Sequence, residues 1–138
     1  MKKKVIVTGC AGFIGSNLVD LLLKKNFSVL GIDNLSTGHL RNLDDANKNK
    51  NFHFVKFDLL DIKKIKNLFK NIDMVFHLAA NADVRFGIDN PKKDLEQNTI
   101  VTFNILESMR VNGVKKIIFS STGSIYGETS IIPTPENV

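Results

Sequence analysis

The chain has 138 residues, of which 43% are hydrophobic and 24% charged, and its net charge is +5. This composition is typical of one soluble globular domain, and no apolar run approaches the roughly 20 residues that a membrane-spanning helix needs. The lysines occur in short scattered groups without interleaved aromatic residues, which argues against nucleic-acid binding. The single cysteine, Cys10, excludes an internal disulfide. We therefore expect a cytoplasmic protein.

In the first half of the chain, the hydrophobic pattern predicts three strands and one helix. Residues 4–8 form a short β-branched run without alternation, which is typical of a buried parallel strand. Residues 12–25 place leucines at helical spacing, and residues 27–32 and 52–57 are expected to be strands. The polar, asparagine-rich segment 33–50 predicts a long loop with a helical turn or two.

The second half continues the alternation of helices and strands. Apolar spacing predicts a helix over residues 62–69, a strand over 73–77, a longer helix over 94–111 and a strand over 115–119. From Ser120 onward, serine, threonine, glycine and proline predict loop. The whole pattern predicts an α/β fold, a doubly wound parallel sheet of the Rossmann type with strand order 3-2-1-4-5 and right-handed crossovers.

Three glycines separate the first strand from the first helix, in the segment T-G-C-A-G-F-I-G at residues 8–15. Gly9 permits a tight turn, Gly12 lets a ligand approach the backbone closely, and Gly15 lets the helix pack against the strand. The helix N-terminus then offers N–H groups and a partial positive charge to a diphosphate. A glycine turn in this context predicts a dinucleotide-binding site.

Asp33, at the end of the second predicted strand, indicates which dinucleotide binds. A carboxylate there accepts hydrogen bonds from the ribose hydroxyls of the adenosine half. It repels a 2′-phosphate, and no arginine stands nearby to bind one, so NAD is favoured over NADP. Cys10, inside the glycine turn, is either a small structural residue or a thiol whose pKa the helix N-terminus lowers.

Further segments match a known pattern in order and in spacing. They are D-N-L-S-T-G at 33–38, D-L at 58–59, H-L-A-A at 77–80, A-D-V-R followed by D-N-P at 82–91, Asn98, and F-S-S-T-G-S-I-Y-G at 119–127. Together with the glycine turn, they resemble the extended short-chain dehydrogenase/reductase superfamily. Within it, the chain is similar to the NAD-dependent epimerases and dehydratases of nucleotide sugars, and most similar to the UDP-glucose 4-epimerase group. Val101 departs from the pattern, because the family often has a glycine there.

The resemblance implies a set of NAD-binding residues and no metal. The set comprises Gly9, Gly12, Phe13, Ile14, Gly15, Asp33, Asn34, Ser36, Thr37, Gly38, Asp58, Leu59, Leu78, Ala79, Ala80, Asn98 and Ser120. Several of these have a simpler alternative. Asp58 could cap the following helix, Asn98 could pair within its own helix, and residues 120–122 could be turn residues. His77 could be a partly buried histidine with satisfied hydrogen bonds and no catalytic role.

The resemblance also implies a reaction. In the family, a tyrosine phenolate assisted by a lysine takes a proton from the sugar 4-hydroxyl, the C4 hydride passes to NAD, and it returns to the other face of the keto sugar. Thr122 matches the residue that hydrogen-bonds the reacting oxygen and relays the proton. Gly123 and Ser124 stand where dehydratases and decarboxylases carry an acid, which favours an epimerase. A non-catalytic NAD-binding module, or another NAD-dependent nucleotide-sugar dehydratase or decarboxylase, is the alternative.

The catalytic tyrosine and lysine have no match in the chain. Tyr126 is the single tyrosine, no lysine follows it four residues later, and it matches a structural position instead. We therefore expect the catalytic pair beyond Val138. The chain would then be an NAD-binding Rossmann domain, incomplete at its C-terminal end, without the substrate domain and inactive alone. The full-length form is expected to bind a nucleotide sugar, with a UDP-sugar favoured, and to form a homodimer.

Overall fold

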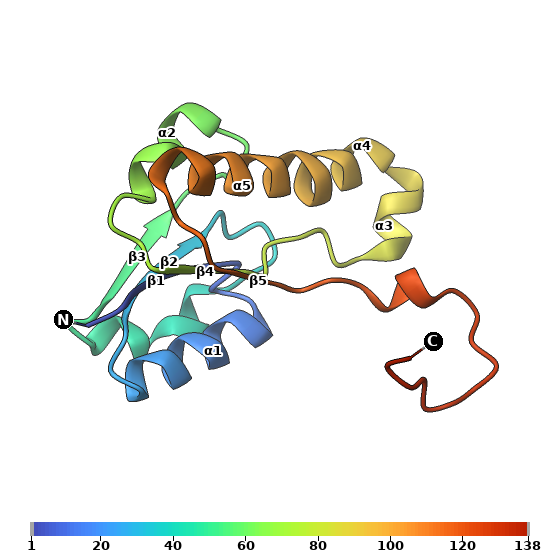
Figure 1. Ribbon diagram of the computed structural model, residues 1–138, viewed down its shortest axis with the longest axis horizontal. Coiled ribbons are helices and arrows are strands. Elements are labelled where there is room, and N and C mark those ends of the chain that lie inside the picture. The colour runs from blue at the N-terminus through green and yellow to red at the C-terminus, as the bar shows by residue number, and fades with distance from the viewer. Residues whose placement is uncertain (1, 138) are drawn as a thin grey trace.

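A buried apolar strand lies at the centre of a five-stranded parallel sheet in the computed structural model, which describes residues 2–137. β1 (Lys4–Thr8) pairs with β2 (Ser28–Asp33) on one side and with β4 (Met74–His77) on the other. The outer strands are β3 (Phe52–Lys56) and β5 (Ile117–Phe119). The order β3-β2-β1-β4-β5 confirms the predicted topology (Figure 1). Met1 and Val138, the ends of the predicted domain, lie outside the described residues.

Helices cover both faces of the sheet (Figure 1). α1 (Phe13–Lys24) lies on one face, and α2 (Ile62–Leu68) and α5 (Val101–Asn112) lie on the other. Two short 3-10 helices, η1 (Leu40–Leu43) and η2 (Ala46–Lys48), supply the helical turns expected in the long loop and pack near α1. Each face of the sheet therefore has its own apolar core, one around Val7, Val19 and Leu43 and one around Ile6, Ile65 and Ile105.

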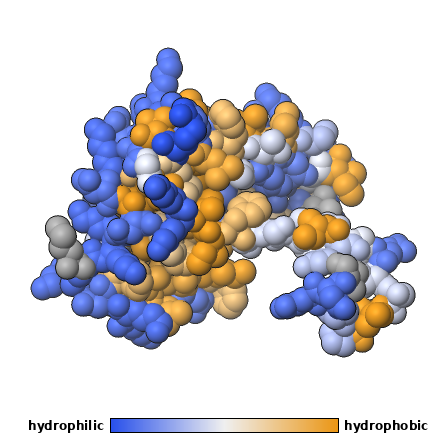
Figure 2. Space-filling view, viewed as in Figure 1, coloured by the Kyte–Doolittle hydropathy of each residue, from blue (hydrophilic) through white to orange (hydrophobic). Residues whose placement is uncertain are grey.

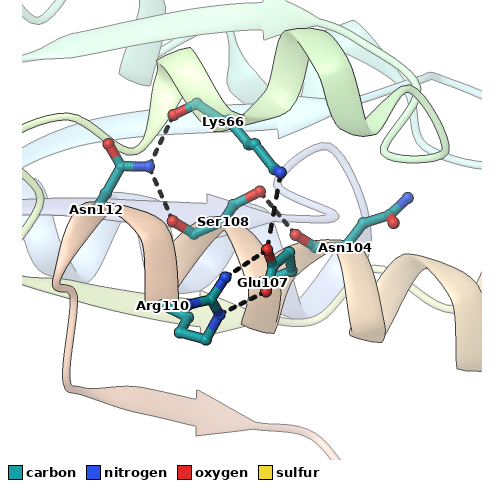
Figure 3. Close-up of polar contacts among 6 residues, drawn as sticks. All are labelled: Lys66, Asn104, Glu107, Ser108, Arg110 and Asn112. Atoms are coloured by element: carbon teal, nitrogen blue, oxygen red, sulfur yellow. Dashed lines mark hydrogen bonds and ion pairs between the residues drawn. The ribbon is translucent and has the colours of Figure 1, made fainter.

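Polar contacts fasten α5 to α2 (Figure 3), and a further one joins α5 to the segment before α2. The side-chain amide of Asn112 donates both to the Lys66 carbonyl (2.9 Å) and to the Ser108 carbonyl (2.8 Å). The Lys66 ammonium lies 3.7 Å from Glu107. One turn earlier, the buried Asn104 donates to the Leu59 carbonyl (2.9 Å). These bonds satisfy carbonyls near the end of α2 and before its start, so they tie α5 to both ends of α2.

The segment between β4 and α5 differs most from the prediction. α3 (Val84–Asp89) was not expected, and the predicted helix 94–111 begins earlier, with α4 (Pro91–Asp94), and continues through a π-helical stretch, η3 (Leu95–Ile100). Asp83 caps α3, because its Oδ1 accepts from the N–H groups of Arg85 (3.1 Å) and Phe86 (3.2 Å). Proline at the first position of α4 then starts the next helix without losing a hydrogen bond.

The segment after β5 runs away from the sheet (Figure 1). It contains one short 3-10 helix, η4 (Gly123–Tyr126), and is otherwise loop, as predicted. Apolar side chains stay exposed along it, among them Ile125 and Ile132. Among residues 2–137, no helix is both long and apolar enough to cross a bilayer.

Exposed lysines precede every strand of the sheet. They are Lys2 and Lys3 before β1, Lys24 and Lys25 before β2, Lys48 and Lys50 before β3, Lys70 before β4, and Lys115 and Lys116 before β5. Because all five strands are parallel, these lysines gather at one edge of the sheet, which we call the lysine edge. The carboxyl ends of the strands lie at the opposite edge.

Candidate functional site

A cavity of about 730 Å³ opens at the carboxyl ends of the strands. In doubly wound sheets, ligands bind at this edge, where the strand order reverses direction. All but one of the residues predicted to bind the cofactor, together with the predicted catalytic Thr122, line the cavity: Gly9, Gly12, Phe13, Ile14, Gly15, Asp33, Asn34, Ser36, Thr37, Gly38, Leu59, Leu78, Ala79, Ala80, Asn98, Ser120 and Thr122. The structure thus brings together segments that are up to about a hundred residues apart in the sequence.

The glycine turn has the geometry that the sequence predicted. Gly9 has a φ of +67°, and a Cβ there would lie 2.9 Å from the Ala79 nitrogen. A Cβ on Gly15 would overlap the Gly9 carbonyl oxygen and lie 2.9 Å from the Cys10 Cα. Gly12 is different, because the nearest protein atom to its Cβ position is the Gly9 oxygen at 3.3 Å. Gly9 and Gly15 therefore serve packing, whereas Gly12 leaves space beside the cavity.

The first turn of α1 faces the cavity without a polar cap. Gly12 is the N-cap residue and provides no side-chain hydrogen bond, and the first turn contains no acidic residue. Phe13 and Ile14 line the cavity and are 84% and 65% exposed. The first N–H groups of a helix have no partner within the helix. This end of α1 can therefore bind an anion through backbone N–H groups and the helix dipole.

Asp33 joins the glycine turn to the loop that follows β2. The carboxylate is buried, its Oδ2 accepts from the Ala11 N–H (2.9 Å), and its Oδ1 accepts from the Leu35 N–H (2.8 Å). Each oxygen has a second lone pair with which it can accept from a ligand hydroxyl. Gly38 closes the same loop onto Ala11, since a Cβ on Gly38 would lie 2.9 Å from the Ala11 Cβ.

Cys10 lies beneath this turn and is fully buried. Burial, and next the nearby Asp33 carboxylate, raise the pKa of the Cys10 thiol to about 12. The thiol is therefore neutral at physiological pH, and the structural interpretation of Cys10 is the one that the geometry supports.

At the end of β4, the buried His77 bridges β1 and α5. Its Nδ1 lies 2.7 Å from the Thr8 Oγ1, and its Nε2 lies 3.1 Å from the Thr102 Oγ1. Burial lowers the pKa of His77 to about 4, so the imidazole is neutral at physiological pH. The Thr8 oxygen also accepts from the N–H groups of Leu78 and Ala79, both at 3.2 Å. The alternative of a histidine with satisfied hydrogen bonds is confirmed for His77.

A second polar group, which the sequence did not predict as a unit, closes one side of the cavity. The Asn98 side chain in η3 accepts from the Asn81 N–H (2.8 Å), and the Asn81 amide donates to Asp94 Oδ1 (2.7 Å). Asn81, Asp94 and Gln97 all line the cavity. Asp94 and Gln97 stand close to the matched Asn98 in the sequence, which was the available signal for a shared role. The sequence did not predict helix α3, and so it did not predict that this segment brings Asn81 to Asp94.

The two remaining predicted site residues are Thr122, at the mouth of the cavity, and Asp58. Thr122 is exposed, and its Oγ1 accepts from the Ser124 N–H (3.2 Å), so it caps η4 at the mouth of the cavity. Asp58 does not line the cavity, and its Oδ1 accepts from the Leu60 N–H (3.0 Å). The cap of α2 is Asp61, so Asp58 is not the helix cap.

The sequence model of the NAD dependent epimerase/dehydratase family matches residues 5–138. The chain belongs to this family. A UDP-glucose 4-epimerase of Mycolicibacterium smegmatis is 41% identical over 138 residues, which cover 98% of this chain and 44% of that protein. The chain spans 31–44% of the length of the curated relatives that it matches.

Solved structures of epimerases have the same fold. The UDP-N-acetylglucosamine 4-epimerase of Methanobrevibacter ruminantium, in complex with UDP-N-acetylmuramic acid, superposes with a TM-score of 0.89 at 39% identity over 99% of this chain and 43% of that chain. The UDP-glucose 4-epimerase of Thermus thermophilus, in complex with NAD, gives a TM-score of 0.82 at 38% identity over 98% of this chain and 41% of that chain.

Proposed function

We propose that the chain provides the NAD-binding part of a nucleotide-sugar 4-epimerase. The observation that carries this proposal is the cavity itself, in which an uncapped helix N-terminus, a glycine turn and a buried carboxylate converge at the carboxyl ends of parallel strands. Family membership and the NAD bound to the Thermus thermophilus relative support it.

The residues fit the cofactor at three places. The first turn of α1, beside Gly12, would hold the diphosphate through backbone N–H groups. Asp33 would accept hydrogen bonds from the adenosine ribose, and its buried negative charge disfavours a 2′-phosphate. Leu59 would contact the adenine, and Phe57 also lines the cavity. Asp58 keeps its proposed adenine contact, since its Oδ1 accepts from the Leu60 N–H and a carboxylate has further lone pairs that can accept from the adenine.

The reaction that we propose for the whole protein is the inversion of a sugar hydroxyl. When bound, NAD supplies the transient acceptor for the C4 hydride. Thr122, at the mouth of the cavity, would hydrogen-bond the reacting oxygen and relay its proton. No tyrosine in the sequence has a lysine four residues later, so the 138-residue chain alone is expected not to interconvert UDP-glucose and UDP-galactose.

We further propose that the partners are a UDP-sugar and, in the full-length protein, a second copy. The sugar partner is supported by the names of two relatives, a UDP-glucose 4-epimerase and a UDP-N-acetylglucosamine 4-epimerase. A homodimer is supported by the outer surface of α5, where the apolar Phe103, Leu106 and Val111 are about half exposed.

Calorimetric titration of the 138-residue chain with NAD and NADP tests the cofactor. We expect heat of binding with NAD and at least tenfold weaker binding of NADP, which corresponds to about 1.4 kcal/mol. Gly12→Ala should weaken NAD binding roughly tenfold, because its methyl group enters the space where the diphosphate would approach the backbone. Gly123→Ala is the matched control, since a Cβ there meets no atom within 4 Å. Folded protein that gives no heat with NAD would overturn the proposal.

A further inference from the structure

Five hydrogen bonds connect the turn after β4 to the π-helical stretch η3. In each of them, the donor lies on the side of the turn and the acceptor on the side of η3. The N–H groups of Leu78 and Ala79 can only donate, and both donate to the Thr8 hydroxyl oxygen at 3.2 Å. At the other end, the Thr102 hydroxyl donates to the Asn98 carbonyl oxygen at 2.6 Å. His77 lies between the two hydroxyl groups, 2.7 Å from one and 3.1 Å from the other.

These two ends fix the proton on the imidazole. A hydroxyl group has one hydrogen, and that of Thr102 is used on the Asn98 carbonyl, so the Thr102 oxygen must accept from His77 Nε2–H. A neutral imidazole protonated at Nε2 has a lone pair at Nδ1, which accepts the Thr8 O–H. The opposite tautomer would leave the Thr8 hydrogen without an acceptor and would place two lone pairs against each other at Nε2.

We propose that His77 is a positioning residue: as the neutral Nε2–H tautomer, it holds the Leu78–Ala79 turn to η3 through Thr8 and Thr102 and thereby sets the affinity of the cavity for its cofactor. This inference rests on the proposed function for its effect on binding, whereas the tautomer itself does not depend on it.

The connection reaches the cavity at both ends. Leu78 and Ala79 line it directly, and the Ala79 backbone packs against Gly9, where a single added methyl group would come within 2.9 Å. A displaced Ala79 would therefore displace the glycine turn. At the other end, Asn98 lines the cavity and holds the Asn81 N–H.

Among residues 2–137, the groups that bond to the His77 ring or pack against it carry no charge that could hold an imidazolium. β1 presents Thr8, α5 presents Thr102, and β5 presents the Phe119 ring with its centroid 5.6 Å away. Within residues 2–137, no ionised group shifts the pKa of His77, and burial alone lowers it. Protonation at Nδ1 would also aim a third N–H at the Thr8 oxygen, whose two lone pairs already accept the Leu78 and Ala79 N–H groups.

The first experiment measures the tautomer in the free 138-residue chain. A long-range ¹H–¹⁵N spectrum of ¹⁵N-histidine-labelled protein at neutral pH distinguishes a protonated Nε2 from a protonated Nδ1. We expect His77 as the Nε2–H form, while the exposed His39 and His53 provide the reference for a mixture. His77 as the Nδ1–H form, or as a mixture like the exposed histidines, overturns the proposal whether or not the chain binds NAD.

The second experiment measures the effect on the cavity. Thr8→Val keeps the shape of the side chain but removes the hydroxyl, and Thr8→Ser keeps the hydroxyl. We expect Thr8→Val to weaken NAD binding roughly tenfold and to accelerate amide hydrogen exchange at Leu78 and Ala79, while Thr8→Ser stays within about twofold of wild type. Thr102→Val tests the other end if Thr8→Val does not fold.

A merely structural role predicts a different result. In that case the valine variants lose thermal stability, but the folded fraction binds NAD as tightly as wild type and the exchange at Leu78 and Ala79 does not change, which overturns the positioning role. If wild-type chain does not bind NAD, the proposed function fails. The tautomer and the exchange rates still decide whether His77 positions the Leu78–Ala79 turn or the turn keeps its place without it.

Discussion

The buried polar side chains of this molecule stabilise it through hydrogen bonds inside the core. Among residues 2–137, every buried side-chain nitrogen or oxygen has a hydrogen-bond partner. Thr8, His77, Asn104 and Ser108 are all nearly inaccessible to solvent, and each bonds backbone or another buried side chain. Breaking any of these bonds leaves a polar group unpaired in the core, which costs about 1–3 kcal/mol.

His77 should make the stability of the chain depend on pH. Its pKa is about 4 in the folded chain and about 6.5 in an unfolded one, so the unfolded state binds more protons between these values. Stability is therefore complete above about pH 6.5 and falls as the pH drops toward 4, by up to about 3 kcal/mol. Urea unfolding between pH 7.5 and 4 measures the loss. His77→Gln, which cannot titrate, should lose less over this interval, and an equal loss would contradict the assignment.

Cys10 should be unreactive in the folded chain. A thiol with a pKa of about 12 and no solvent contact has almost no thiolate at pH 8. We expect a thiol reagent to label Cys10 at the rate of global unfolding, and at once in denaturant. Fast labelling of native protein would show that the glycine turn opens independently of the rest of the fold.

At the scale of elements, the junction of β1 and α1 depends on two backbones in direct contact. Gly15 in α1 lies against the Gly9 carbonyl and the Cys10 Cα, and neither is a flexible side chain that could yield. The helix can therefore approach the strand only because no Cβ stands between them.

Gly15→Ala should separate α1 from β1. The added methyl group overlaps backbone atoms, so we expect a destabilisation of about 3 kcal/mol, at the upper end of typical overpacking costs. Urea unfolding followed by circular dichroism measures it, with Gly123→Ala as the neutral control. A loss below about 0.5 kcal/mol in Gly15→Ala would mean that α1 can shift without cost.

The sequence predicted the elements that have strong periodicity and missed those that depend on capping. β1 and α1 were found within a residue or two, since a β-branched run and leucines at helical spacing each favour one structure. α3 was missed because it is short and contains Gly87, and the signal for it was the single cap residue Asp83. The cavity was predicted through its glycine turn and Asp33, whereas the Asn81–Asp94 pair depends on how α3 and α4 fold back.

At the scale of the whole molecule, β3 and β5 are the two edge strands of the sheet, and β5 is the one that exposes large apolar side chains. β5 pairs with β4 alone among the described residues, and its Ile118 and Phe119 are each 51% exposed. An apolar band runs over this part of the surface, between α1 and α5 (Figure 2). An unpaired strand edge with apolar side chains is a template for association.

The 138-residue chain should therefore self-associate through β5. An antiparallel pair centred on Ile118 would bring two Ile118 side chains together and place Lys115 and Lys116 of one copy opposite serines of the other, away from like charges. Sedimentation velocity measures the association. Ile118→Lys should shift the chain toward monomer, and Ile88→Lys, on the exposed α3, should not. Equal association of both variants would place the contact elsewhere.

The lysine edge concentrates positive charge on the side of the molecule opposite the cavity. Nine exposed lysines lie where the strands begin, and the cavity lies where they end. On an anionic support such as a sulfonate resin, the chain would therefore settle on its lysine edge, with the mouth of the cavity turned outward to the solution. Adsorbed protein would keep its ligand access without any engineered tether, and its release by salt would leave the cavity chemistry untouched.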